Sequence, residues 1–598
     1  SKKDLVFNAI KLGVDNHPFL FTGHFELGGE KPLYYLEIKS EKLLYQKGKT
    51  LVSGNIARRL DSFTVEKPID VKAIIDGRLL PNRIPLVNID VLFNGNSVST
   101  KAGQFANVVC KANFTNQFDK LKPNNDENSG FQFTGFSGSL EGIPLRADST
   151  SIVNLLHPEL KTRILADFSL DKLNEMMSGS TIEILQGSCK ADIRYKGLMI
   201  VGDTSSASVF GSIAITNASL RYIPRNLVLS DVKGSILLDN TDVWVKQLAV
   251  KSGSSEMVMN GEIRNFTSLI DKNPERLLLN WNIESSRLNL NDFISFVGKR
   301  SGLKTIAHSK RKTLRIFNQI DQMLNKCTVE VKISAQKATY KKFDATRVFA
   351  EARMTGNEIV LKKAQLDHAG GSMSFSGILK QLPGNNDFSF NADMRDVDVK
   401  KVFSSFNNFN QDGITDHNIE GKLTASSNIS GSITDKAELV NNSLKGRVDL
   451  LLREGGLKKF EPLEKISRTA FKNRDFSDIH FADLKERLDI NGSEIKLGKM
   501  EIQSSVMTMF VQGIYDLEKG TDISIQIPMS NLAKRNDSFT PRNKGINSRT
   551  GISLFLRAKS GEDGKTKVSW DPFKKALKNA RRRADSLDIS KKSAMPEP

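Results

Sequence analysis

The chain has 598 residues, of which 39% are hydrophobic and 26% charged, so it has enough apolar side chains for a core and is not a disordered protein. Its charge sum, 87 − 68 = +19, favours acidic partners such as nucleic acid or anionic lipid headgroups, although a solvated basic face would give the same sum. The three cysteines lie far apart, which excludes a disulfide scaffold, and no window approaches the ~18 apolar residues of a transmembrane helix.

Apolar and polar residues alternate along most of the chain, from about residue 20 to 558. Clear runs lie at 87–93, 329–333, 388–394 and 523–527. A period of two places the apolar side chains on one face of a strand and the polar ones on the other. Asn, Gly, Asp and Ser separate the runs, as expected of turns. The pattern predicts a mainly antiparallel β protein.

Few segments carry apolar residues at helical spacing. The sequence predicts helices at 288–298, 304–325, 398–406 and 457–473, and the second of these has basic residues at its start. The first and third follow Asn- or Asp-bearing segments that can cap a helix. We expect the apolar faces of these two helices to plug or cover the sheet, and a role at a membrane surface is the alternative.

Three stretches, 242–261, 358–377 and 494–513, align with one another. Each is a strand, a turn of small residues and a second alternating strand that stops at Gly. A meander of this kind cannot close a core alone and must stack on its neighbours, which gives an elongated sheet.

The order of these segments resembles the AsmA-like family of Gram-negative envelope proteins, especially its C-terminal domain. The resemblance lies in the strand pairs 211–222 and 229–238, in 446–466 and 476–484, and in the repeat that ends at Gly513. It covers about residues 200–530, and residues 20–200 look like a diverged form of the same meander.

The resemblance implies a bridge-like lipid transfer protein of the periplasm. Family members carry a long β-groove with an apolar lining, and an N-terminal helix holds them in the inner membrane. That helix is absent from this chain and is expected upstream of Ser1. The implied partners are phospholipid acyl chains, the inner membrane and outer-membrane components. The implied role is to move phospholipid or otherwise support outer-membrane assembly.

We therefore expect a mainly β fold, an elongated repetitive antiparallel sheet curled into an apolar groove, with a few short covering or plugging helices. The expected parts are a diverged N-terminal groove (1–200), a β-meander repeat ending in a helix (201–300), a basic amphipathic helix (301–326), a second repeat with a helix (327–410), the AsmA-like C-terminal repeat (411–560) and a basic flexible tail (561–598).

The candidates for the groove lining are apolar residues of the three aligned repeats, because the flexible thioether of Met adapts to irregular partners. They are Val243, Val245, Met257, Met259, Met373, Phe375, Met507, Met509 and Val511. The competing interpretation is a closed sandwich in which the same residues are ordinary core.

No residue pattern points to catalysis. The seven histidines are isolated apart from His17 and His24, and no zinc, P-loop or nucleophile-elbow motif is present. We expect no enzyme activity, metal or cofactor. Nucleic acid is also not expected, because the aromatic residues, 7% of the chain, are mostly Phe on the apolar strand faces. The alternative function is a non-transporting scaffold or an assembly factor for outer-membrane proteins, which would have a dry, filled interior.

Overall fold

A computed structural model gives the fold, in which about 68% of the residues are strand and 10% helix. It describes residues 4–14, 16–28, 32–52, 54, 57, 60–61, 63–81, 83–100, 103–175, 177, 181–198, 207–266, 276–298, 326–410, 414–461, 463–464, 474–516, 520–532, 535, 539–542, 551–561 and 566–579.

The chain divides into two compact units. The first contains Ser1–Ser252, Val258–Trp281 and Ser301–Val329, and the second contains Gly253–Met257, Asn282–Arg300 and Glu330–Pro598. Strands β1 to β14 lie in the first unit and β18 to β30 in the second.

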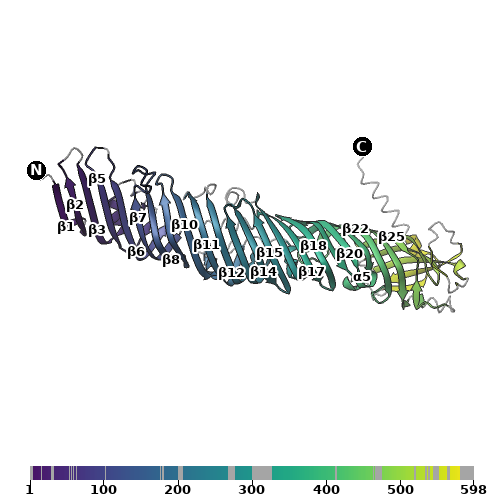
Figure 1. The fold of residues 1–598 in the computed structure, drawn as a ribbon. Coiled ribbons are helices and arrows are strands. Elements are labelled where there is room, and N and C mark those ends of the chain that lie inside the picture. The colour runs from purple at the N-terminus through teal and green to yellow at the C-terminus, as the bar shows by residue number, and fades with distance from the viewer. Residues whose placement is uncertain are drawn as a thin grey trace, which may run out of the picture. The chain divides into compact units, whose positions relative to one another are not determined.

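The strands of the first unit are long and follow one another along the chain (Figure 1). They are β1 (Asp4–Val14), β2 (His17–Glu26), β3 (Leu33–Leu43), β4 (Thr64–Val65), β5 (Ile69–Arg78), β6 (Leu86–Thr100), β7 (Gly103–Thr115), β8 (Gly130–Leu140), β9 (Ile143–Val153), β10 (Glu159–Ser169), β11 (Ile182–Leu198), β12 (Ser208–Tyr222), β13 (Leu227–Asp239) and β14 (Asp242–Ser252). Apart from the short β4, each strand pairs antiparallel with the next in this series.

The strands β15 (Ser255–Ile263), β16 (Leu278–Asn289) and β17 (Thr328–Tyr340) have residues in both units. The second unit continues with β18 (Phe343–Thr355), β19 (Glu358–His368), β20 (Gly371–Gln381), β21 (Asn386–Asp398), β22 (Ile419–Ile433), β23 (Lys445–Lys458), β24 (Asp478–His480), β25 (Leu484–Asn491), β26 (Glu494–Gln503), β27 (Thr508–Asp516), β28 (Gly520–Pro528), β29 (Ser553–Ser560) and β30 (Thr566–Trp570). These strands are also paired antiparallel, so the predicted fold class is confirmed.

The turn between β19 and β20 illustrates how the sequence makes these hairpins. His368 pairs with Gly371, so the loop has only the two residues Ala369 and Gly370. Both have positive φ angles, 50° and 80°. A two-residue turn of this kind matches the twist of the strands, and Gly adopts it without steric cost.

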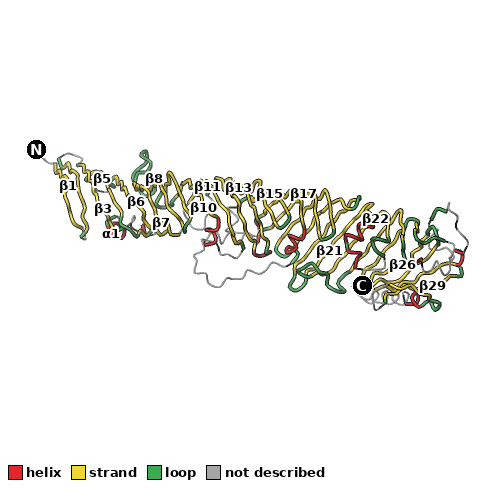
Figure 2. Tube along the Cα trace, turned by 90° about the horizontal axis from the view of Figure 1, so that it is seen from below, coloured by secondary structure: helices red, strands yellow, loops and turns green. Residues whose placement is uncertain are grey.

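The described helices are short and lie among the long strands (Figure 2). Those described from end to end are α1 (Tyr45–Thr50) and α5 (Val399–Ser405), with the 3-10 helices η1 (Leu170–Glu175), η2 (Ile223–Arg225), η4 (Leu290–Phe296), η5 (Asn407–Asn410) and η6 (Met529–Leu532). No helix in the described ranges is long and apolar enough to cross a membrane.

Two of the four predicted helices are confirmed. The segment 398–406 contains α5, and the Asp398 carboxylate accepts a hydrogen bond from Lys401 N at 3.2 Å, as a cap does. Val402 of α5 packs with Met373 and Val397, so this helix covers the sheet as expected. The segment 288–298 forms the tighter 3-10 helix η4, capped by the side chain of Asn289.

The other two predicted helices lie wholly or partly outside the described residues. The segment 304–325 lies outside them. The prediction for 457–473 was wrong at its start, because residues 457–458 are the last two of β23. Helix is present further on, at 461 and 463–464. The expected tail, 561–598, is also not a tail where it is described: β30 pairs with β29, and residues 575–579 are helical.

Candidate functional site

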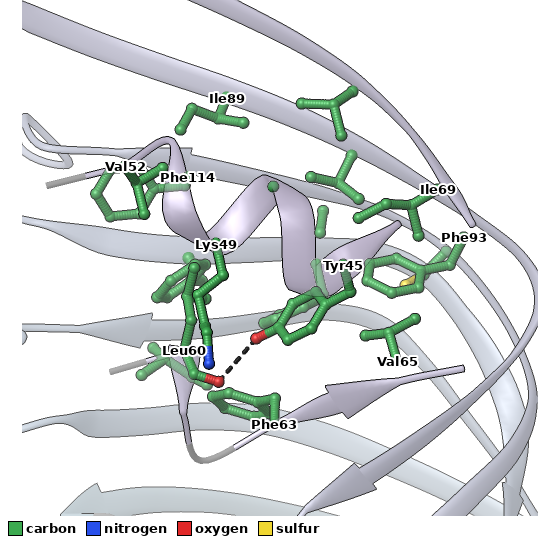
Figure 3. Close-up of a pocket in the computed structure, with 18 of the residues that line it drawn as sticks. Tyr45, Lys49, Val52, Leu60, Phe63, Val65, Ile69, Ile89, Phe93 and Phe114 are labelled. Atoms are coloured by element: carbon green, nitrogen blue, oxygen red, sulfur yellow. Dashed lines mark hydrogen bonds between the residues drawn. The ribbon is translucent and has the colours of Figure 1, made fainter. Parts of the chain in front are cut away.

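The first unit contains a cavity of about 1490 Å³, which we call the N-terminal cavity. Its wall is the inner face of β2, β3 and β5 to β10 (Figure 3). Side chains of α1 also line it, as do Leu51, Val52, Leu60, Phe63 and Val65. Sites for a single small molecule are usually about 300–1,000 Å³, so this cavity has room for a larger apolar ligand.

The wall is built from rows of side chains that face one another across neighbouring strands. One row consists of Phe21, Ile38, Ala73, Ile89, Phe114, Phe131, Ile152 and Leu160, and each member is paired with the next. Eight strands contribute to it, so the row spans seven strand spacings, roughly 33 Å at about 4.8 Å each. Every member is apolar, which gives an unbroken hydrocarbon surface across the sheet.

Most side chains of this row are only partly covered by other parts of the protein. Phe114 is 5% exposed, but the other seven members are only half-buried. Apolar side chains in a filled core are normally buried completely. The wall therefore retains apolar surface that a ligand can cover.

Helix α1 lies over part of the wall, and its Tyr45 side chain reaches across to Leu60 (Figure 3). The Tyr45 hydroxyl donates a hydrogen bond to the carbonyl oxygen of Leu60 at 2.8 Å. Burial, assisted by the negative charge of Asp61, raises the pKa of Tyr45 to about 12. Lys49 forms an ion pair with Asp61, with Nζ 2.5 Å from Oδ1. These contacts connect α1 to residues 60–61 and keep the segment over the cavity.

Three polar side chains of the wall are hydrogen-bonded within the protein. The hydroxyl groups of Thr150 and Thr162 lie 2.7 Å apart. The Asn116 side chain accepts from Val87 N at 2.9 Å and donates to the Pro85 carbonyl at 2.8 Å. Because these groups already have hydrogen-bond partners, an apolar ligand can lie against them without leaving them unpaired.

The outer face of the same strands is ionic. Glu37 on β3 is 2.7 Å from Lys39 Nζ and 3.0 Å from Lys72 Nζ, and hydrogen bonds from these two lysines lower the pKa of Glu37. On the next strands Asp90 accepts a hydrogen bond from Asn113 at 3.0 Å. The sheet therefore separates a charged outer surface from an apolar inner one, as the period-two pattern predicts.

None of the residues predicted to line a groove borders the N-terminal cavity. Met507 and Met509, 0% and 5% exposed, lie in a packed cluster with Phe476, Ile479 and Ile527, and Val511 packs against it. Met373 is 3% exposed in the cluster with Val397 and Val402, where Phe375 also packs.

The remaining candidates belong to the first repeat. Met257 is 6% exposed, and Met259 and Val245 are half-buried. Val243 packs against a cluster of Ile263, Leu277, Leu279 and Cys327. A lipid-lining role for these nine residues stays a prediction. The large cavity lies within residues 1–200, for which the sequence predicted a diverged part of the groove and no lining residues.

Among the described residues, one group has the chemistry of metal ligands, Glu420, Asp478 and His480, whose ligand atoms lie within 4.8 Å of one another. Lys458 Nζ is 2.8 Å from a Glu420 carboxylate oxygen, and this carboxylate raises the pKa of Lys458. The group is an ion-pair network on the surface, and we assign no metal to it.

Comparison of the chain with protein-family models, with curated proteins and with solved structures gives no match.

Proposed function

We propose that this protein binds phospholipid acyl chains in the N-terminal cavity and moves phospholipid along the apolar face of its sheet. The observation that supports this proposal most strongly is the row of apolar side chains from Phe21 to Leu160. The row is continuous over eight strands, and seven of its eight side chains are half-buried. We place the protein in the periplasm of a Gram-negative bacterium, anchored to the inner membrane, as the resemblance to the AsmA-like family implies.

The energetics of such a wall suit a chain that binds and still moves. Each buried methylene contributes about 0.8 kcal/mol, so an acyl chain is held by many small and similar contributions. The wall offers apolar contacts at successive strands, so a displaced chain exchanges one set of contacts for an equivalent one. A site with strong polar contacts would instead hold its ligand at one position.

The support from the cavity is independent of the resemblance. The best-matching segments cover about residues 200–530, and the cavity is lined by residues between Val14 and Ile164. The resemblance supplies the proposed location, and the cavity supplies a binding surface.

The test uses two neighbouring positions on β6 that face opposite ways. Ile89 lines the cavity, while Asn88 does not. We expect Ile89→Asp to lower the amount of phospholipid that co-purifies with the protein, because a carboxylate on the wall must lose its hydration when an acyl chain covers it. Asn88→Asp introduces the same charge on the other face and should keep the wild-type amount.

The measurement is lipid extraction and mass spectrometry of the purified proteins, after circular dichroism has established that both variants are folded. A wild-type protein that never carries lipid, or equal lipid in both variants, would contradict the proposal. It would favour the scaffold function, for which the filled cluster around Met507 in the second unit is the supporting observation.

A further inference from the structure

The C-terminal end of the second unit displays aromatic side chains beside lysines. Trp570 is 56% exposed and Phe573 is 71% exposed, and these are the two most exposed Trp and Phe side chains in the described part of the chain. Between residues 566 and 579 the sequence has four lysines, Lys567, Lys574, Lys575 and Lys578, and one acidic residue, Asp571, so its net charge is 4 − 1 = +3.

These exposed side chains lie on a turn that is held by hydrogen bonds. Trp570 is paired with Leu556 in the hairpin of β29 and β30. Asp571 is 5% exposed, and its carboxylate accepts hydrogen bonds from Lys575 N and Ala576 N, both at 2.9 Å. Ala576 is buried beneath the turn, at 1% exposure. The buried carboxylate therefore fixes the backbone on both sides of Phe573.

Burial of Asp571 removes the one acidic group of this segment from its exposed surface. Its carboxylate is used inside the turn, whereas the side chains of Lys574, Lys575 and Lys578 are exposed. Lys574 extends over the ring of Phe555, with Nζ 4.6 Å from the ring centre. The exposed charged side chains among residues 567–579 are therefore all cations, and they lie close in sequence to two exposed aromatic rings.

We propose that Trp570, Phe573 and the lysines at 574, 575 and 578 form a patch that docks on an anionic lipid surface. Indole and phenyl rings partition into the region between headgroups and acyl chains. Lysines next to a negatively charged membrane each strengthen binding by roughly fivefold, and salt weakens this contribution. A nucleic acid would share the charge preference, but it would need the rings interleaved with cations over several nucleotides. Two rings at one turn fit a membrane surface better.

Trp570 supplies a local reporter, because the other two tryptophans, Trp244 and Trp281, are half-buried. The probe is a vesicle of phosphatidylcholine alone, or one in which about a third of the lipid is phosphatidylglycerol. With the second vesicle we expect co-sedimentation and a blue shift of tryptophan fluorescence that disappears in Trp570→Phe. With phosphatidylcholine alone we expect neither.

Two further variants separate the charge from the rings. Lys575→Gln with Lys578→Gln should reduce partitioning roughly 25-fold, from about fivefold for each lysine. Phe573→Ala should reduce it while leaving the salt dependence unchanged. The matched controls are Lys190→Gln with Lys196→Gln, two lysines that are 75% and 65% exposed on β11, and Phe210→Ala, a ring that is 45% exposed on β12. They should bind like wild type.

Binding without a response of Trp570, equal binding to both vesicles, or equal losses in the controls would overturn the proposal. So would a Trp570 response to a single-stranded oligonucleotide in the absence of any response to vesicles. The variants lie on the surface, and circular dichroism checks that each is folded. The patch lies far along the chain from the N-terminal cavity, so this test is independent of the proposed acyl-chain binding.

Discussion

Thr150 on β9 and Thr162 on β10 lie directly opposite each other on the wall of the N-terminal cavity, and their hydroxyl oxygens are 2.7 Å apart. Each hydroxyl has a partner on the neighbouring strand. Two polar groups can therefore face an apolar cavity without exposing an unpaired donor to it.

This pairing predicts a non-additive response to mutation. Thr150→Val or Thr162→Val alone should lower the free energy of unfolding by about 1 kcal/mol, because the remaining hydroxyl loses its partner. The double variant should be close to wild type, since both polar groups are gone and the shape is kept. Urea denaturation of the four proteins completes the cycle, and a double variant that loses the sum of the two single effects would show that the hydroxyl groups are not coupled.

Tyr45 should titrate at unusually high pH. Its pKa is raised to about 12, so the folded protein holds the phenolic proton more tightly than the unfolded chain, whose pKa is near the ordinary value of 10. The stability that this proton contributes is complete below about pH 10 and is lost as the pH rises towards 12. Difference absorbance of wild type against Tyr45→Phe should show one phenol ionising near pH 12. An ordinary titration near pH 10 would mean that α1 does not bury this ring.

Packed and cavity-facing residues should differ in their effect on stability. Met507 is 0% exposed, and Met507→Ala should cost about 2–5 kcal/mol of unfolding free energy. Ile89 is half-buried on the cavity wall, so Ile89→Ala should cost clearly less, about 1 kcal/mol, because its side chain has fewer protein contacts to lose. Chemical denaturation of both variants checks the ranking, and equal costs would indicate that the wall is filled like a core.

The thiols of Cys110 and Cys189 should react slowly. Burial raises the pKa of each to about 11, and the nearby Asp167 carboxylate adds to the effect at Cys189. Only the thiolate reacts with iodoacetamide, so we expect alkylation to accelerate by about tenfold per pH unit between pH 8 and 10. Mass spectrometry of digested samples measures each site. A rate that levels off near pH 9 would show that these thiols are not buried.

The alternation of residue types was sufficient to predict the inner face of individual strands. Val87, Ile89, Val91 and Phe93 were placed on one side of a strand, and all four line the cavity. A period of two depends only on strand geometry, so it can be read from one segment at a time.

The position of the cavity could not be read in this way. Whether an apolar face is covered depends on what packs against it, and Met373 and Met259 carry the same local pattern although the first is 3% exposed and the second is half-buried. Helix α1 was missed because it has six residues, and its N-cap, Leu44, makes no side-chain hydrogen bond. The aromatic residues at 19, 21, 131 and 133 were the available signal, since large rings on alternating positions need either a partner or a ligand.

The regular pairing of the first unit has a consequence for how such a protein can change over evolutionary time. From β7 to β13 each strand is paired with the strand just before it and the strand just after it in the chain. Its contacts are therefore local in sequence, and folding can begin at any hairpin and spread to its neighbours. Duplication of one hairpin would lengthen the wall by roughly 10 Å while every other strand keeps its direction and its inner face. The length of this sheet can thus change in steps of two strands while the existing residues stay the same.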